Sequence, residues 1–300
     1  MTTNNGLLLV DKPRGLTSHD VVARVRKLLN ERRVGHAGTL DPMATGLLVL
    51  GVGPSTRLLR FAQSQTKRYT GAVTFGVATD SLDADGAVVE RCDVPALKSE
   101  LVNVVAHTLT GEQQQIPPMV SALKVDGRRL HAMARQGLEV ERDARDVNVS
   151  VFTLRPSDDE NIWFFDVTCS VGPYVRVLLS DLAQRLGTVG HLSSLRRLSS
   201  GAYEVTNAWT LEQVETRLES AEHVLLAPRE FVVDLEHVTL PLDEERRMRM
   251  GQHLVLPETF VGDEIAAMDG HGALIGVLRR RGEKWKPEIV LVRDETHERR

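Results

Sequence analysis

Cysteine is scarce in this chain: Cys92 and Cys169 are the two cysteines among 300 residues. They stand far apart, and neither belongs to a Cys-x-x-Cys motif or has a histidine-rich partner segment. A disulfide framework needs more cysteines than this, and a zinc site needs several Cys or His ligands at short spacing. The sequence therefore indicates neither kind of protein, and both thiols are expected to be inert.

Long hydrophobic runs are absent as well. No uninterrupted apolar stretch approaches the roughly 20 residues that a membrane-spanning helix needs. The first residues, MTTNN, lack the charged-then-apolar pattern of a signal peptide. With 42% hydrophobic and 26% charged residues, the composition is typical of an ordinary globular protein. We therefore expect a packed, cytoplasmic protein that does not enter a membrane.

Several motifs of catalysis and cofactor binding are also missing. There is no Walker motif and no dinucleotide fingerprint, so neither ATP nor nicotinamide use is predicted. There is no Gly-x-Ser-x-Gly elbow for a serine nucleophile, and His36 and Asp41 lack a third metal ligand at a recognisable interval. The segment DSLDADG at residues 80–86 resembles a calcium loop but lacks its later acidic ligand, so we expect a turn. No metal or cofactor is predicted.

The sequence does contain an unusual loop, GHAGTLDPMATG, at residues 35–46. Its glycines, threonines and proline favour turns, and apolar runs on both sides would hold it on a rigid scaffold. Asp41 is its single carboxylate, with an ordinary pKa of about 3.9, and such a group can act as nucleophile, base, metal ligand or charge partner. No second carboxylate stands in an equally protected place. From the residues alone, a structural turn capped by Asp41 stays open.

Charge is unevenly distributed along the chain. The formal net charge is −4, yet residues 1–70 contain eleven basic and four acidic side chains. Nucleic-acid binding depends on where charge lies and not on its total. The basic excess around the loop therefore favours a groove that follows phosphates, with an ordinary solvated face as the alternative.

Hydrophobic periodicity and turn residues predict the other elements. Strands are expected at residues 6–11, 47–52, 67–77, 147–154, 162–171 and 201–205, with a loop over 32–46 and an extended segment over 115–125. A helix is expected after the N-cap hydroxyls of Thr17 and Ser18, with apolar positions from Val21 to Leu29. Other helices are expected from Pro54, over 95–109, near 129–135 and over 177–187. A domain boundary is predicted at residues 228–234, because five short strand-like runs follow it at 237–240, 252–256, 264–268, 274–279 and 288–292. These runs predict a small β-barrel.

Six segments carry a resemblance to a known family. They are GLLLVDKP at 6–13, VGHAGTLDPMATGLLVL at 34–50, KRY at 67–69, residues 116–125, GPYVR at 172–176 and LRRL at 195–198. In this order, over residues 6–210, they resemble the TruB family, the bacterial tRNA pseudouridine(55) synthases. That family converts one uridine of the tRNA T-loop to its C-glycoside isomer and uses no metal or redox cofactor.

The resemblance implies an isomerase with an α+β (mixed α/β) fold. A catalytic domain on a largely antiparallel sheet is expected over residues 1–230, and a PUA-like RNA-binding β-barrel over residues 231–300. The implied partner is the T stem-loop of tRNA, and the implied enzyme is a monomer without an obligatory protein partner. Two rivals stay open: a pseudouridine synthase that acts on another RNA, and an RNA-folding chaperone whose chemistry is secondary.

The resemblance also assigns roles to individual residues. Asp41 matches the nucleophile that attacks the flipped nucleotide, and whether it attacks the base ring or the sugar C1′ stays open. Tyr69 matches the aromatic ring that stacks on the flipped base, with a core tyrosine as the alternative. Arg176 matches the arginine that pairs with the aspartate, and we expect this pair to keep Asp41 ionised despite burial. Tyr174 matches a tyrosine that packs in the pocket.

Three further positions are implied around this centre. His36 matches a histidine that enters the T-loop and fills space left by flipped bases. Leu195 matches an apolar wall of the uracil pocket, and plain core packing is also compatible with it. Lys12 matches the first motif of the family and is expected to support the active site structurally.

Overall fold

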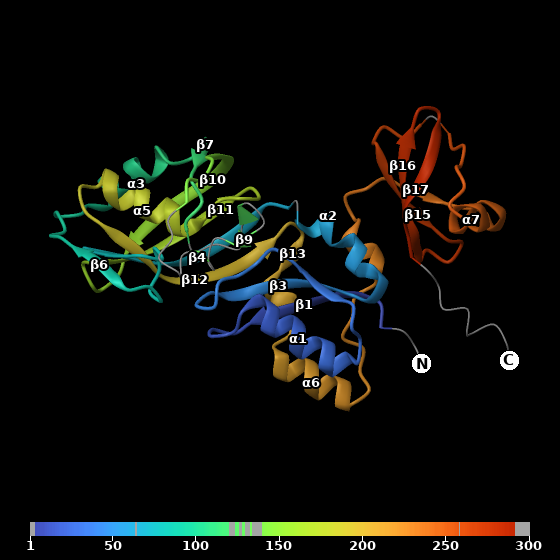
Figure 1. Cartoon of the computed structure of the whole chain (residues 1–300), viewed down its shortest axis with the longest axis horizontal. Helices are drawn as coiled ribbons and strands as arrows, with labels where there is room; N and C mark the ends of the chain where they lie inside the picture. The colour runs from blue at the N-terminus through green and yellow to red at the C-terminus, as the bar shows by residue number, and fades with distance from the viewer. Residues whose placement is uncertain are drawn as a thin grey trace.

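The computed structural model describes residues 4–63, 65–119, 124–125, 128–129, 133, 140–257 and 259–291. Most of the segment expected as a helix near residues 129–135, and part of the extended segment 115–125, lie outside these residues. Two sheets dominate the described chain: a large one built mainly by its first two thirds and a smaller one near its C-terminal end (Figure 1). None of the described helices is long and apolar enough to cross a membrane.

The large sheet has the strand order β1-β3-β12-β4-β11-β10-β7, with β2 added to β3 and β13 added to β12. All pairs are antiparallel except β3 with β12, so the expected largely antiparallel sheet is confirmed. The strands are β1 (Gly6–Lys12), β2 (Val34–Ala37), β3 (Thr45–Val52), β4 (Lys67–Phe75), β7 (Gly111–Gln115), β10 (Arg145–Pro156), β11 (Ile162–Cys169), β12 (Gly190–Ser200) and β13 (Tyr203–Glu204). The expected hairpin is confirmed by the pairing of β10 with β11.

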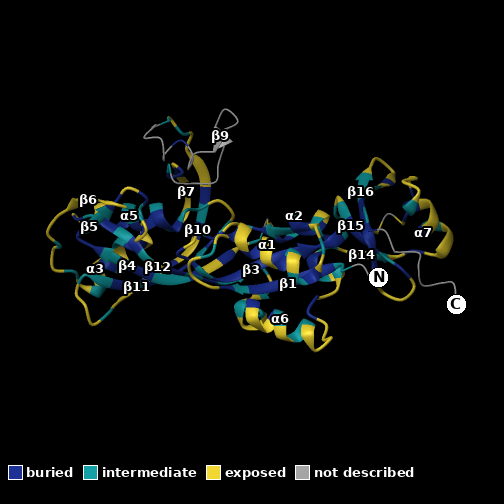
Figure 2. Cartoon of the chain, turned by 60° about the horizontal axis from the view of Figure 1, so that its bottom comes forward, coloured by how far each residue is buried: buried dark blue, intermediate teal, exposed yellow. Residues whose placement is uncertain are grey.

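Helices cover the large sheet in two groups (Figure 2). The first group packs on β1 and β3, and its α1 begins at a capping box in which Thr17 and Asp20 satisfy each other's backbone N–H groups. The second group packs on β4, β11 and β12. The helices are α1 (Ser18–Leu29) and α6 (Leu211–Glu219) in the first group, and α3 (Ser99–His107) and α5 (Val175–Arg185) in the second.

Short elements connect these layers. They are η1 (Gly53–Leu58), α2 (Leu59–Gln63), β5 (Val77–Thr79), β6 (Val88–Arg91), β8 (Lys124–Val125), β9 (Arg128–Arg129), η2 (Val205–Asn207) and η3 (Pro228–Phe231). The segment expected as a turn, residues 80–86, does form turns between β5 and β6.

The smaller sheet follows η3 in the chain. It contains β14 (His237–Thr239), β15 (Glu264–Met268), β16 (Leu274–Arg281) and β17 (Lys284–Val290), with α7 (Leu242–Arg249) beside it. Among the described residues these strands form an open sheet in the order β14-β15-β16-β17, so a closed barrel is not confirmed. One face of this sheet shares a core with η1, α2 and the large sheet. The division at residue 230 stays a prediction.

Three sequence expectations were wrong in detail. The loop expected over 32–46 contains β2, because Val34–Ala37 pairs with β3 and extends the sheet. No strand was expected over 190–200, yet the segment 195–198 lies inside β12, where adjacent arginines masked the alternation of a buried strand. The strand expected at 201–205 shrinks to β13, because Gly201, at φ +58°, makes the turn.

The C-terminal expectations also need correction. Residues 252–256 form no strand, and Leu254 makes one isolated bridge to Trp285. The last strand begins at Lys284, earlier than expected.

The helices α6 and α7 were not predicted. For α6 the signal was present and overlooked: Thr210 and Gln213 form a capping box, and Leu211, Val214 and Leu218 recur at helical spacing. The segment of α7 has few apolar positions, so its helical pattern is weak.

Candidate active site

The Asp41 loop connects β2 to β3 and turns at two glycines. Gly38 has φ +88° and Gly46 has φ +99°, a region that residues with a Cβ rarely adopt. A Cβ on Gly46 would stand 2.3 Å from the carbonyl oxygen of Arg197. The small residues of the motif therefore let β3 pass close to β12, and Asp41 lies in the loop between the paired strands β2 and β3.

The start of α1 holds this loop from one side. The Ser18 hydroxyl accepts a hydrogen bond from Leu40 N–H at 2.8 Å and donates one to Leu40 O at 3.1 Å, and both bonds are buried. Gly15 N–H donates to Pro42 O at 2.8 Å. The residues before and after Asp41 are thus both tied to the segment that enters α1.

Replacing Ser18 by alanine tests this support. The change leaves the buried N–H and C=O of Leu40 without the hydroxyl, so we expect the free energy of unfolding to fall by about 1–3 kcal/mol. Urea denaturation measures the loss. Ser220→Ala, at an exposed serine that ends α6, is the control and should leave stability unchanged. Equal stability of the two variants would show that Ser18 does not hold the loop.

Lys12 supports the loop from a second side. Its Nζ donates to Leu16 O at 2.7 Å, to Pro13 O at 3.0 Å and to Pro42 O at 3.4 Å, and the residue is fully buried. Burial lowers the pKa of Lys12 to about 8, although the nearby Asp41 carboxylate opposes the shift. The structure places Lys12 where it joins the end of β1 to the residue that follows Asp41.

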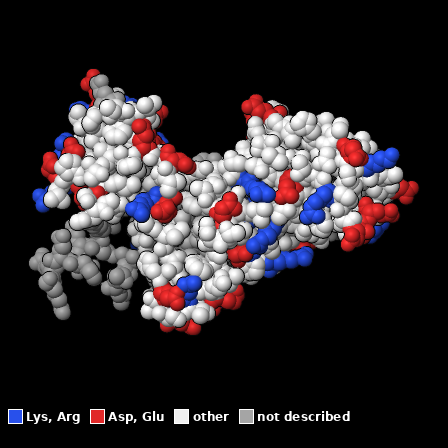
Figure 3. Space-filling model, turned by 180° about the vertical axis from the view of Figure 1, so that it is seen from behind, with Lys and Arg blue, Asp and Glu red and all other residues white. Residues whose placement is uncertain are grey.

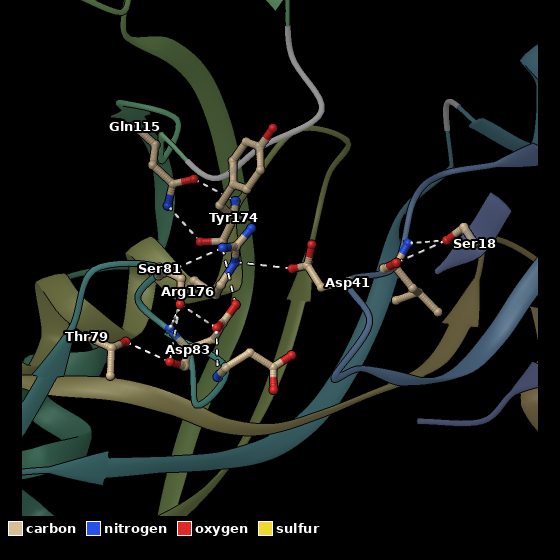
Figure 4. A network of polar contacts seen from close by, with 10 residues as sticks. Ser18, Asp41, Thr79, Ser81, Asp83, Gln115, Tyr174 and Arg176 are labelled. Carbon is tan, nitrogen blue, oxygen red and sulfur yellow. Dashed lines mark hydrogen bonds and ion pairs between the residues drawn. The ribbon is translucent and has the colours of Figure 1, made fainter. Parts of the chain in front are cut away.

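Arg176, at the start of α5, links two carboxylates (Figure 4). Its Nε lies 3.2 Å from Asp41 Oδ2, and its Nη1 lies 3.3 Å from Asp83 Oδ2. Nη1 also donates to Ser81 O at 2.8 Å. The Asp83 carboxylate in turn accepts from Ser81 Oγ at 2.5 Å and from Asp85 N–H at 3.1 Å. The turn at residues 80–86 therefore fixes the guanidinium that faces Asp41.

Sequence reasoning missed Asp83. The sequence predicts a turn for its segment and rejects a calcium loop, but it assigns no role to Asp83, for which the acidic residues of the turn were the available signal. Among the described residues no cluster of three or more His, Cys, Asp or Glu side chains could hold a metal ion.

The Asp41 carboxyl has a raised pKa. Burial is the largest cause, the Arg176 guanidinium opposes it, and the Asp83 carboxylate reinforces it. The side chain is 34% exposed, so it is reachable from solvent while protein surrounds its other sides. The expected ion pair between Asp41 and Arg176 is present. Burial nevertheless has the larger effect, so the pKa of Asp41 is raised and not lowered.

The two tyrosines approach from different elements. Tyr69 lies on β4, paired with Val167 of β11 and Arg197 of β12, and burial raises the pKa of its hydroxyl. Tyr174 caps α5, where its N–H donates to Gln115 Oε1 at 2.6 Å and its carbonyl accepts from Gln115 Nε2 at 3.2 Å. Figure 4 shows the Tyr174 ring beside the pair of Arg176 and Asp41.

His36 and Leu195 lie on β2 and β12, the two strands that pair with β3 beside β1. His36 is half-buried on β2 opposite Leu50, and burial together with the charge of Arg197 lowers its pKa. Leu195 packs in the core with Tyr69 and also borders a hollow of about 260 Å³. Asp41, Tyr69 and Arg176 do not line this hollow. Its lining is Arg14, Met43, Thr45, Thr70, Gly71, Phe164, Ser193, Ser194, Leu195 and Arg196.

Comparison with solved structures defines the class of fold. The chain superposes on a protein of an H/ACA RNP bound to a substrate RNA containing 2′-deoxyuridine, with a TM-score of 0.72 and 20% identity, covering 97% of this chain and 86% of that one. A chain of an archaeal box H/ACA sRNP Nop10-Cbf5 complex gives a TM-score of 0.70 at 21% identity, covering 96% of this chain and 87% of the other. At these identities the likeness concerns the fold.

Sequence relatives define the family. Residues 26–175 match the N-terminal domain of TruB family pseudouridylate synthases, and residues 176–245 match the tRNA pseudouridylate synthase B C-terminal domain. The tRNA pseudouridine synthase B of Leifsonia xyli subsp. xyli is 42% identical over 299 residues, covering 97% of this chain and 98% of the relative. That of Rhodococcus jostii is 43% identical over 295 residues, covering 97% and 95%. The chain belongs to the TruB family of pseudouridylate synthases.

Proposed function

We propose that this chain isomerises uridine 55 in the T-loop of tRNA to pseudouridine, with Asp41 as nucleophile. One observation carries the proposal: Asp41 stands in the loop between β2 and β3, partly open to solvent, 3.2 Å from a buried arginine. The names of the relatives, which are tRNA pseudouridine synthases, support the substrate. Because no metal or redox step is needed, the named side chains suffice for the chemistry.

The reaction is a balanced rearrangement. Asp41 attacks the nucleotide and forms a bond to it, the bond between N1 and C1′ breaks, and the freed uracil turns. A bond then forms between C5 and C1′, and the bond to Asp41 breaks, so the carboxylate is regenerated. The proton lost from C5 is balanced by one gained at N1. Arg176 stabilises the ionised carboxylate, and Tyr69 stacks on the flipped base, an interaction worth about 1–3 kcal/mol.

The other site residues position the RNA in this proposal. His36 fills the space that flipped bases leave, Tyr174 packs beside the base, Leu195 forms an apolar wall, and Lys12 supports the loop. Residues 1–230 form the catalytic domain and residues 231–300 a PUA-like RNA-binding domain. One copy of the chain acts without an obligatory protein partner.

Mapping pseudouridine in an unmodified tRNA after incubation with the purified protein tests the proposal. We expect modification at position 55, and the same product on an isolated T-arm stem-loop. Product on ribosomal RNA with none on tRNA would support the rival enzyme. Binding without product on any RNA would support a chaperone.

A second expectation concerns salt. Figure 3 shows basic and acidic side chains interspersed on the face opposite to that of Figure 1, so binding should depend on particular arginines and not on a uniform field. Arg14 is exposed and adjoins Gly15, whose N–H bonds the Asp41 loop. We expect tRNA affinity to fall steeply with salt, and Arg14→Ala to reduce the slope of log K against log salt by about 1.

The control for this measurement is Arg91→Ala. Arg91 is exposed on β6, at the far end of the large sheet from the smaller one (Figure 1). The Arg91→Ala variant should keep the wild-type slope of log K against log salt. A wild-type affinity that hardly changes with salt would contradict a phosphate-binding role for the basic N-terminal region.

A further inference from the structure

Arg197 is a fully buried arginine at the junction of three strands. On β12 it is in register with Tyr69 of β4 on one side and with Gly46 of β3 on the other. Its Nε donates to Leu47 O at 2.6 Å and its Nη2 donates to Gly38 O at 3.1 Å. Tyr69 is the register partner of Arg197, and the Arg197 guanidinium lowers the pKa of the Tyr69 hydroxyl against the larger effect of burial. One side chain therefore bonds both ends of the Asp41 loop and interacts with the tyrosine.

The charge of Arg197 is unusual for a structural residue. Among the described residues it has no carboxylate within ion-pair distance. The same charge also lowers the pKa of Lys12, Lys67 and His36. A buried cation without a carboxylate costs folding free energy, and an apolar residue would fill a strand position without that cost. What an apolar residue could not provide at this position is the planar guanidinium of Arg197 with its several hydrogen-bond donors.

Arg196, which precedes Arg197 on β12, provides a comparison. Arg196 points to the other face of β12, is less buried, and forms a two-point ion pair with Asp11 at 3.0 and 2.7 Å. Two adjacent arginines in the same strand are thus used differently. Arg196 closes an ordinary ion pair, whereas the hydrogen bonds of Arg197 go to the two ends of the Asp41 loop, beside Tyr69.

We propose that Arg197 is a positioning residue for the isomerisation: it fixes the Tyr69 ring relative to the Asp41 loop by its interaction with the Tyr69 hydroxyl and its bond to the carbonyl of Gly38. This inference rests on the proposed function. Gly38 precedes Asp41 by three residues, so the clamp sets the distance between the carboxylate that attacks and the ring on which the base stacks. A small displacement of reacting groups lowers the rate much more than it lowers binding.

A double-mutant cycle with Arg197→Lys and Tyr69→Phe tests this role. Phenylalanine keeps the stacking ring and removes the hydroxyl, so Tyr69→Phe alone should lower kcat on tRNA by about 10- to 100-fold and change KM little. Arg197→Lys should lower kcat similarly. In the Tyr69→Phe background it should add a much smaller factor, because the interaction is already lost. If the loss of kcat in the double variant equals the product of the losses in the two single variants, the proposal is overturned.

Because Arg197→Lys removes donors at a fully buried position and lowers the stability of the fold, the cycle has a second arm. A wild-type kcat for Tyr69→Phe overturns the proposal whatever the arginine variant does, since the hydroxyl would then be dispensable. Arg185→Lys, at an exposed arginine of α5, is the control and should leave kcat and KM unchanged. Calorimetry of each protein separates loss of rate from loss of fold. If the wild-type protein itself makes no pseudouridine in tRNA, the proposed function fails and not the clamp.

Discussion

Asp41→Asn should make no pseudouridine while binding tRNA almost as well as the wild type. The change removes the nucleophile but keeps the size of the side chain and one acceptor oxygen that faces Arg176. Binding is expected to persist because phosphate contacts, and not this carboxylate, supply most RNA affinity. Product is measured by mapping pseudouridine and affinity by filter binding. Pseudouridine formed by this variant would eliminate Asp41 as the nucleophile.

Asp41→Asn is expected to abolish activity without lowering the stability of the folded protein. Folding raises the pKa of the Asp41 carboxyl. The folded protein therefore binds a proton at Asp41 more readily than the unfolded chain, in which an aspartate has a pKa of about 3.9. The contribution of Asp41 to stability therefore falls as the pH rises through this window, and ionised Asp41 opposes folding at neutral pH. We expect Asp41→Asn to be at least as stable as the wild type at pH 7.

Urea denaturation at several pH values measures this effect. The advantage of Asp41→Asn over the wild type should grow from about pH 4 upward and then level off above the raised pKa. Asp158→Asn, at an exposed turn aspartate, is the control and should show no such trend. A variant less stable than the wild type at neutral pH would mean that the ion pair with Arg176 outweighs burial.

The sequence predicts the candidate site unevenly. The Asp41 loop is recognisable because its small residues are consecutive, and the geometry they permit is local. Asp83 could not be assigned, because its role depends on a turn that meets the start of α5 only in the folded chain, 93 residues further on at Arg176. Patterns of neighbouring residues predict the local backbone conformation. Contacts between residues far apart in the sequence depend on the order of the strands in the folded sheet.

The pair Arg196 and Arg197 shows the same limit on a smaller scale. Two identical adjacent side chains suggest one basic surface, and alternation along a strand sends them to opposite faces. Which of the two is buried depends on the register of β12 against β3 and β4. That register includes a bulge between Leu192 and Ser194, a feature that the sequence did not reveal.

The second large effect is expected at Arg176. Arg176→Met removes the cation that faces Asp41, so kcat should fall by about 10²–10³-fold, as when a preorganised electrostatic partner is lost. The acid limb of kcat/KM should also move to higher pH, because burial raises the pKa of Asp41 and Arg176 has the largest of the influences that lower it. Single-turnover rates across pH measure both changes.

Asp83→Asn should move the acid limb the other way. The Asp83 carboxylate raises the pKa of Asp41, so its removal lets Asp41 ionise at lower pH, although a looser Arg176 reduces the rate at every pH. Arg185→Met, at an exposed arginine in the last turn of α5, is the control and should keep the wild-type profile. Because the two charges act on Asp41 with opposite sign, shifts in the same direction, or no shift in either variant, would show that the acid limb does not report the ionisation of Asp41.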